Sequence, residues 1–423
     1  MMCQQKDTAV IISNKKTQTI MNTFFSQLKK MSAALVLLFL VYYSCRSEDT
    51  ITAIPISEDS FPNVKAFFGN NLNLSALENY ANQAKPNYIT RDNTGTNKIT
   101  DIGSTLGRVL FYDKNLSKNN TVSCFSCHKQ ELAFGDNTVA SIGVNGNTGR
   151  HSMRLVNARF GNEAKFFWDE RAATLENQTT QPIQDHKEMG FSGSDGDENI
   201  TALIAKLQNI GYYNELFTFA FGDKTITQER IQNALAQFVR SIQSFDSKYD
   251  TGRNLAGNDQ ANFANFTAQE NLGKQLFLTP PVFDNNSNRV GGGLGCAGCH
   301  AAPEFDIDPN TRNNGIIGII NGIGIDVNNT RSPSLRNVTK ADGTENGPFM
   351  HTGNLQSLQN VIGHYGTITI AAGNTNLDPR LRPNGIGQKL NLNATEVNAV
   401  VAFLKTLGGS DVYTNKKWGN PFP

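Results

Sequence analysis

Four cysteines and two histidines form a pattern that predicts covalent attachment of a cofactor. The motif C-x-x-C-H occurs twice, at Cys124–His128 (CFSCH) and at Cys296–His300 (CAGCH). This spacing is the attachment signature of c-type haem, because two thiols can add to the porphyrin vinyl groups while the adjacent histidine ligates the iron from one face. A single motif could instead form a redox disulfide or half of a zinc site. The presence of two copies argues against this alternative. The predicted attachment residues are Cys124, Cys127, Cys296 and Cys299, with His128 and His300 as metal ligands.

A weak internal repeat places one helix before each motif. Leu106–Phe111 (LGRVLF) precedes the first motif, and Leu272–Phe277 (LGKQLF) precedes the second. Each copy has the pattern of a short amphipathic helix, followed by a loop that would carry the haem. The sequence therefore predicts a mainly α fold with two cytochrome c-like domains, each carrying one covalently attached haem c.

The same pattern sets the expected domain boundaries. We predict an N-terminal linker over residues 45–89, a first haem domain over 90–255 and a second over 256–423. Residues 250–266 are expected to connect the two domains. The Asn- and Gly-rich stretch 284–294 is predicted to be a loop, and strand signals are sparse.

Two further helices are predicted from periodicity and capping. Apolar residues recur at spacings of three and four over residues 231–242, which predicts a helix that ends near Asp246. Asn393 and Glu396 form a capping pair before an apolar run, and Gly408-Gly409 is expected to end that helix.

Composition excludes several classes of protein. The chain has 423 residues, of which 18% are charged and 38% hydrophobic, and its formal net charge is +1. This composition is typical of globular proteins and excludes a disordered chain or a protein with many membrane spans. The charge gives no indication of nucleic acid binding.

The first 44 residues have the pattern of a targeting segment. Lys29 and Lys30 precede an apolar run over residues 33–43, which ends at Ser44-Cys45. The run is too short for a membrane span and suits a signal peptide. Cysteine directly after the run resembles a bacterial lipoprotein site, so we expect a lipid anchor at Cys45, with ordinary signal cleavage as the alternative. The expected location is the periplasm or the cell exterior, and the anchor would be the only contact with a membrane.

Several blocks beyond the two motifs resemble a known family. The order of the blocks is similar to that of the bacterial di-haem cytochrome c peroxidases, which include the di-haem enzyme that matures methylamine dehydrogenase. The resemblance extends from about Leu106 to Leu407. The blocks are Leu106–Asp113 (LGRVLFYD), Ser123–His128 (SCFSCH), Phe166–Ala172 (FFWDERA), Pro182–Met189 (PIQDHKEM), Cys296–His300, Pro333–Val338 (PSLRNV) and Pro348–Gly353 (PFMHTG).

The resemblance implies roles for four residues. The N-terminal haem would be the peroxidatic one, the C-terminal haem would accept electrons, and Trp168 would lie between them. Glu188 matches the acid-base glutamate of the family, and Gln178 and Phe167 match residues that orient peroxide and exclude water. Without the resemblance, Trp168 would be interpreted as a core aromatic residue and Glu188 as a solvated surface charge. His186 is close to Glu188 in sequence, and a surface position is the simpler interpretation for it.

The resemblance also bears on the first iron and on calcium. Val144 occupies the place of a histidine that blocks the peroxidatic iron in other peroxidases of the family, so we expect an open, five-coordinate first haem. His151 replaces an asparagine that binds calcium in the family. Because calcium prefers hard oxygen ligands, this replacement leaves the binding of one calcium ion open.

The second haem would need another ligand if it stores electrons. Alignment places Tyr365 where other peroxidases of the family have methionine, and the maturation enzyme uses tyrosine there. His364 is the second choice and Met350 the third.

The resemblance thus implies a peroxidase that reduces hydrogen peroxide to water with electrons from a small cytochrome c or copper protein. One alternative is a di-haem oxidase of a protein or organic substrate. The other is a non-enzymatic electron-transfer cytochrome, against which an acid-base group and an open iron would argue.

Overall fold

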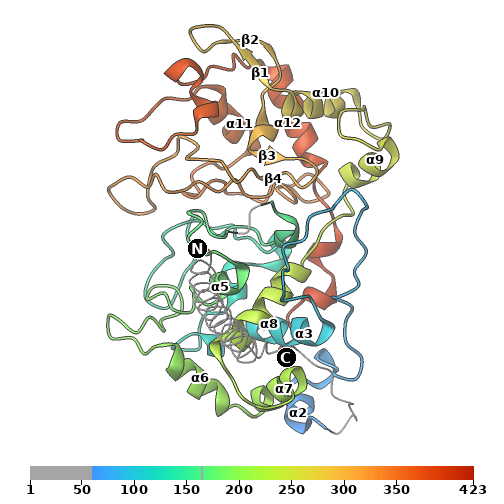
Figure 1. The fold of residues 1–423 in the computed structure, drawn as a ribbon, viewed down its shortest axis with the longest axis vertical. Helices are drawn as coiled ribbons and strands as arrows, with labels where there is room; N and C mark the ends of the chain where they lie inside the picture. Colours follow the sequence, from blue (N-terminus) through green and yellow to red (C-terminus); the bar gives the residue numbers. More distant parts are fainter. Residues whose placement is uncertain (1–59, 163–164) are drawn as a thin grey trace, which may run out of the picture. The chain divides into compact units, whose positions relative to one another are not determined.

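A computed structural model describes residues 60–162 and 165–423 of the chain, shown in Figure 1. The predicted signal peptide, Cys45 and the first part of the predicted linker lie outside these residues. The helices are α2 (Pro62–Phe68), α3 (Asp101–Tyr112), α4 (Cys124–Cys127), α5 (Leu175–Thr179), α6 (Ile200–Gln208), α7 (Gly211–Phe221), α8 (Gln228–Ser241), α9 (Lys248–Ala256), α10 (Ala268–Leu278), α11 (Leu358–Gly366) and α12 (Ala394–Lys405). The strands are β1 (Pro281–Phe283), β2 (Arg289–Gly292), β3 (His300–Ala301) and β4 (Asp306–Ile307).

Side chains at the first turns explain where several helices begin. The N-cap of α12 is Asn393, which accepts a hydrogen bond from the backbone N–H of Glu396 at 3.0 Å, while Glu396 accepts from the N–H of Asn393 at 3.2 Å. These two bonds form the predicted capping box. The helix ends at Lys405, three residues before Gly408, because Thr406 already serves as its C-cap. The helix predicted from residues 231–242 is confirmed as α8, but it ends at Ser241 and not near Asp246, because Ile242 already has an extended backbone.

Two segments differ from their predictions. The stretch 284–294, predicted to be a loop, contains strand β2, which pairs antiparallel with β1 and places Val282 opposite Gly291. Residues 250–266, predicted to be only a connection, begin inside helix α9. Ser247 and Asp250 form a capping box there, a local signal that the sequence analysis did not use.

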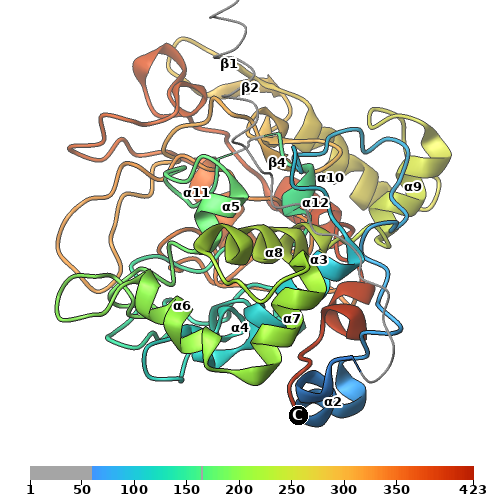
Figure 2. The same ribbon diagram turned by 60° about the horizontal axis from the view of Figure 1, so that its bottom comes forward.

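Glycine allows the two repeats to build the same pair of packed helices. Helix α3 packs on α8, and α10 packs on α12, as Figures 1 and 2 both show. A Cβ atom added to Gly107 would overlap the carbonyl oxygen of Ala234, and one added to Gly273 would overlap that of Ala399. The Leu-Gly pair of each repeat therefore marks a close approach between two helix backbones.

Buried apolar side chains form two main cores in the described residues. The first extends from Phe61 to Ile242 along the chain and includes Val412 and Trp418, and the second extends from Tyr249 to Leu407. The C-terminal tail thus returns to the first core, which the sequence analysis did not anticipate. The fold is mainly α with two small two-stranded sheets.

No helix within residues 60–162 and 165–423 is long and apolar enough to cross a membrane.

Candidate functional site

Helix α4 holds the first attachment motif. Its N-cap is Ser123, whose backbone N–H donates to the hydroxyl of Ser126 at 3.0 Å. Burial raises the pKa of the Cys124 thiol to about 12 and that of Cys127 to about 11, so both thiols are protonated at neutral pH. All four motif cysteines are free.

His128 is held in an orientation that suits a metal ligand. Its Nδ1 atom lies 3.1 Å from the carbonyl oxygen of Phe134 and donates a proton to it. This bond fixes the tautomer and leaves Nε2 as the available lone pair. Burial lowers the pKa of His128, which keeps the imidazole neutral as ligation requires.

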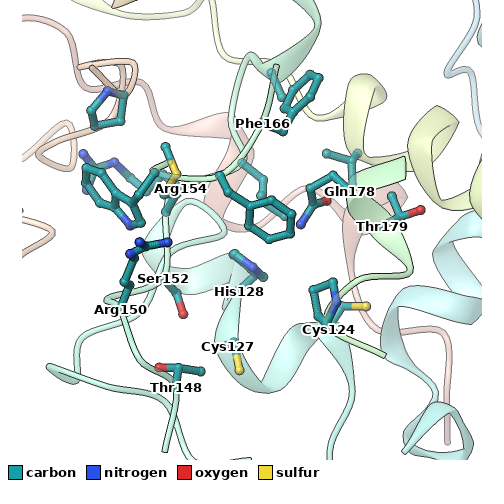
Figure 3. A pocket seen from close by; sticks show the side chains of 18 of the residues that line it. Cys124, Cys127, His128, Thr148, Arg150, Ser152, Arg154, Phe166, Gln178 and Thr179 are labelled. Carbon is teal, nitrogen blue, oxygen red and sulfur yellow. The ribbon is translucent and has the colours of Figure 1, made fainter. Parts of the chain in front are cut away.

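A cavity of about 590 Å³ adjoins this motif. Its volume falls within the roughly 300–1,000 Å³ that is usual for cofactor and ligand sites. Figure 3 shows Cys124, Cys127 and His128 together with Gln178 around this space. The cavity is lined by every residue of the first half that the sequence analysis placed in a site, namely Cys124, Cys127, His128, Phe167, Trp168, Gln178 and Glu188.

Glu188 has the properties of an acid-base group. Burial is the main cause that raises the pKa of its carboxyl group to about 7; the negative charge of Asp185 acts in the same direction and the positive charge of Arg171 opposes both. The Glu188 N–H donates to the Asp185 side chain at 3.0 Å, so the two residues share one tight turn. Arg171 lies over the Phe167 ring, with its guanidinium carbon 3.6 Å from the ring centroid.

Val144 bonds to the backbone of Glu188 and does not line the cavity. Its N–H donates to the carbonyl oxygen of Glu188 at 3.0 Å, and the N–H of Asn145 donates to that of Lys187 at 3.1 Å. A Cβ atom added to Gly143 would overlap the Lys187 carbonyl oxygen, so glycine permits this close approach. Among the described residues around the cavity, Val144 is not a lining residue.

His151 lines the cavity and is fixed by backbone bonds. Its N–H donates to the His351 carbonyl oxygen at 2.7 Å, and its Nδ1 donates to that of Thr138 at 2.8 Å. The indole N–H of Trp168 donates to the His151 carbonyl oxygen at 2.7 Å. His186 lies away from the cavity lining, where its Nδ1 is 2.8 Å from Asp197.

Trp168 connects the two halves of the chain. Its carbonyl oxygen accepts hydrogen bonds from the N–H groups of Thr330 and Arg331, at 2.9 and 3.0 Å. Its ring meets that of His351 edge to face, with centroids 6.2 Å apart. The residues on the other side belong to the half that holds the second motif.

The second attachment motif spans a short 3-10 helix (Cys296–Gly298) and strand β3. Burial raises the pKa of both Cys296 and Cys299 to about 12 and lowers that of His300 to about 4. The second site therefore repeats the chemistry of the first, with two protonated thiols and one neutral imidazole.

The three candidate second ligands meet at Asn314. Its side-chain amide donates to the Tyr365 hydroxyl and to the Met350 sulfur, each at 3.3 Å. The Nε2 of His364 donates to the Asn314 carbonyl oxygen at 2.9 Å. Burial holds the pKa of Tyr365 well above its usual value, and the Cys299 and Cys296 thiols act in the same direction.

These donor sets fit a porphyrin held through its edge. Each site offers two thiols and one imidazole with a neutral lone pair, and the first adjoins a cavity of suitable volume. Within the described part of the chain, no group of three or more His, Cys, Asp or Glu residues could hold a metal ion directly.

Sequence reasoning missed several charged residues of the first cavity. Arg150 forms ion pairs with Asp169 at 2.6 Å and with Asp326 at 2.7 Å, and Arg154 lines the same wall. Asp185 belongs to the block that contains Glu188, and this proximity could have indicated it. No local pattern distinguishes Arg154 from an exposed arginine.

Comparison with known proteins gives consistent results. The family described as di-haem cytochrome c peroxidase matches residues 102–260. The methylamine utilization protein MauG of Methylophilus methylotrophus is 29% identical over 74% of this chain and 84% of its own. The cytochrome c551 peroxidase of Nitrosomonas europaea is 29% identical over 72% of this chain and 79% of its own. The crystal structure of a MauG-like protein associated with microbial copper homeostasis matches with a TM-score of 0.62 at 29% identity, covering 80% of this chain and 99% of its own.

Proposed function

The chain belongs to the di-haem cytochrome c peroxidase family, and from that premise we propose that it reduces hydrogen peroxide to water. The electrons would come from a small cytochrome c or copper protein. The observation that carries this proposal is the position of Glu188, a carboxyl group with a pKa of about 7 on the wall of the cavity next to His128.

We assign the cofactors as two haem c groups in two cytochrome c-like domains, over residues 90–255 and 256–423. Two separate cores support two domains, although the cores divide between Ile242 and Tyr249, before the proposed boundary, and Val412 and Trp418 return to the first core. His128 and His300 would ligate the irons. A haem bound in the first cavity would supply an iron centre at which the oxygen–oxygen bond of peroxide can break.

The proton chemistry would fall to Glu188. Peroxide must lose a proton from one oxygen and gain one on the leaving oxygen, and a single carboxyl group can perform both transfers in turn. A pKa close to neutral pH suits both roles, because neither the acid nor the base form is then scarce. Gln178 and Phe167 line the same cavity and would orient peroxide and exclude water.

Trp168 would pass electrons between the two sites. Its hydrogen bond to His151 and its ring contact with His351 support this role, since they join the first cavity to the second half. We propose Tyr365 as the second ligand of the C-terminal haem, with His364 as second choice. The bond from His364 Nε2 to the Asn314 carbonyl oxygen holds that nitrogen as a donor, so only Nδ1 of this ring could ligate an iron.

Export and calcium are proposals from the sequence. A lipid anchor at Cys45 would hold the enzyme at a membrane surface in the periplasm or on the cell exterior. Binding of one calcium ion near His151 stays a proposal. His151 Nδ1 donates to the Thr138 carbonyl oxygen and supplies no oxygen ligand.

A second candidate function is oxidation of a protein or organic substrate. Tyr365 as the second ligand would favour it, because a hard oxygen ligand stabilises higher iron charge better than a thioether does. An electron-transfer cytochrome without enzymatic activity is less well supported, since a carrier needs no acid-base group.

Steady-state peroxide consumption with a reduced small cytochrome c tests the proposal. We expect Glu188→Gln to retain two haems and the visible spectrum of the wild type while turnover falls by roughly 10²-fold or more, the usual scale for a lost acid-base group. His186→Gln is the matched control and should leave turnover unchanged, because His186 lies outside the cavity lining. Equal turnover in Glu188→Gln and wild type would remove Glu188 from the mechanism.

A further inference from the structure

Four arginines line the cavity at the first attachment motif, and they differ in their partners. Three of them lie against carboxylates: Arg150 pairs with Asp169 and Asp326, Arg171 pairs with Asp169, and Arg331 lies 3.8 Å from Asp306. The fourth is Arg154. Among the described residues, no carboxylate pairs with it.

The Arg154 guanidinium is buried and only partly satisfied. Its Nη1 donates to the carbonyl oxygen of Asn346 at 3.2 Å, while its Nε is buried without a hydrogen-bond partner. Burial lowers the pKa of Arg154 to about 10, which still leaves the group charged at neutral pH. The structure thus holds an uncompensated cation in the wall of the cavity.

The surrounding groups do not supply the missing negative charge. The carboxyl group of Glu188 responds to Asp185 and Arg171, not to Arg154. The group that acts electrostatically on Arg154 is Tyr413, whose own pKa is raised by burial, so it is a neutral phenol.

Packing fixes the side chain at this wall. The Arg154 stem crosses Gly135, where an added Cβ atom would lie 2.8 Å from Arg154 Cγ. Gly135 follows Phe134, whose carbonyl oxygen orients His128. Figure 3 shows Arg154 and Arg150 on the cavity wall beside His128.

A buried charge is strongly destabilising unless an opposite charge accompanies it. The cofactor assigned to this cavity carries that charge, because a haem bound to cysteines through its vinyl edge presents two carboxylates at the opposite edge. Arginine is the side chain best suited to a buried carboxylate, since its planar fork can donate two parallel hydrogen bonds. We propose that Arg154 binds a propionate carboxylate of the haem attached at Cys124 and Cys127.

This inference rests on the haem attachment in the proposed function and not on peroxide turnover. The test is a spectroelectrochemical titration of the holoprotein with two haems per chain. Loss of the cation should disfavour the added electron, so Arg154→Gln should lower the reduction potential of the first haem and leave that of the second unchanged. Arg154→Lys should restore part of the shift. Arg230→Gln is the control, because Arg230 pairs with Asp223 away from the cavity.

Three outcomes would overturn the inference. The first is a first-haem potential that is the same in Arg154→Gln and wild type. The second is an equal fall in the potentials of both haems. The third is a wild-type potential that changes with added formate, which would assign Arg154 to a free carboxylate instead of the porphyrin. If Arg154→Gln does not fold, Arg154→Lys must shift the propionate bending band in the resonance Raman spectrum, and an unchanged band contradicts the proposal. A protein with two haems and no turnover would refute the peroxidase assignment alone.

Discussion

Opposing effects set the pKa of the Glu188 carboxyl group. Burial and the negative charge of Asp185 raise its pKa to about 7, and the positive charge of Arg171 lowers it. Asp185 also accepts hydrogen bonds from the N–H groups of Lys187 and Glu188, at 2.8 and 3.0 Å. The turn that presents Glu188 to the cavity therefore also sets the pH at which it can accept a proton.

The pH dependence of peroxide turnover follows from this arrangement. Glu188 must be ionised to take the first proton, so kcat/KM should fall as the pH drops below about 7. Asp185→Asn retains the hydrogen-bonding oxygen and removes the charge, which lowers the pKa of Glu188. The fall in kcat/KM should then occur at lower pH. Asp195→Asn is the control, because Asp195 does not line the cavity. Identical pH profiles for Asp185→Asn and wild type would contradict this explanation.

At the scale of elements, two helix pairs support the two attachment sites. Helix α3 lies on α8 and α10 lies on α12, and each pair approaches closely at one glycine. The short segments that hold the cysteines lie between the two helices of each pair in the chain, soon after α3 and soon after α10. Each repeat thus places its attachment motif shortly after a helix that packs closely on a later helix.

The glycines predict a measurable effect on stability. Gly107→Ala or Gly273→Ala should lower the free energy of unfolding by about 1–3 kcal/mol or more, because the added methyl group overlaps a backbone carbonyl of the facing helix. Gly363→Ala in α11 meets no atom within 4 Å and should raise it by roughly 0.5–1 kcal/mol. Denaturant titrations of the three variants decide the matter, and equal effects at all three positions would refute the close-packing argument.

The sequence predicts those features that depend on neighbouring residues. The attachment motifs, the capping box of α12 and the periodicity of α8 each depend on spacings within a few residues. The capping box and the α8 helix are confirmed, and haem attachment at the motifs stays a prediction. Asn314 and Arg154 were not found from the sequence, because their partners Tyr365 and Asn346 lie far along the chain. The return of Trp418 to the first core is a tertiary contact of the same kind.

At the scale of the whole molecule, one tryptophan and one arginine join the two sites. Trp168 bonds to His151 through its indole and to Thr330 through its carbonyl oxygen. Arg150 forms ion pairs with Asp169 beside it and with Asp326 in the second half. Polar contacts therefore hold Trp168 to both halves of the chain.

Replacement of Trp168 should slow electron exchange between the two haems. Trp168→Phe removes the bond to His151 and part of the ring system, so flash reduction of one haem should equilibrate more slowly with the other while both potentials stay the same. Trp418→Phe is the matched control, because this tryptophan is buried in the first core and bonds to the Ser241 carbonyl oxygen at 3.1 Å. Equal exchange rates in the two variants would exclude Trp168 from the path.

The central proposal is that the first cavity, once it holds its haem, is open to peroxide without prior reduction. Val144 does not line the cavity and has no metal-ligating group. His151 does line it, and its Nδ1 donates to the Thr138 carbonyl oxygen, so His151→Ala is the variant that tests whether its Nε2 blocks the site. The direct test is stopped-flow mixing of the fully oxidised protein with one equivalent of hydrogen peroxide. We expect the visible spectrum of the oxidised wild type to change after mixing with peroxide. The rate of this change should be roughly 10²-fold lower in Glu188→Gln. A wholly low-spin resting spectrum, with peroxide reactivity only after one-electron reduction, would contradict the claim.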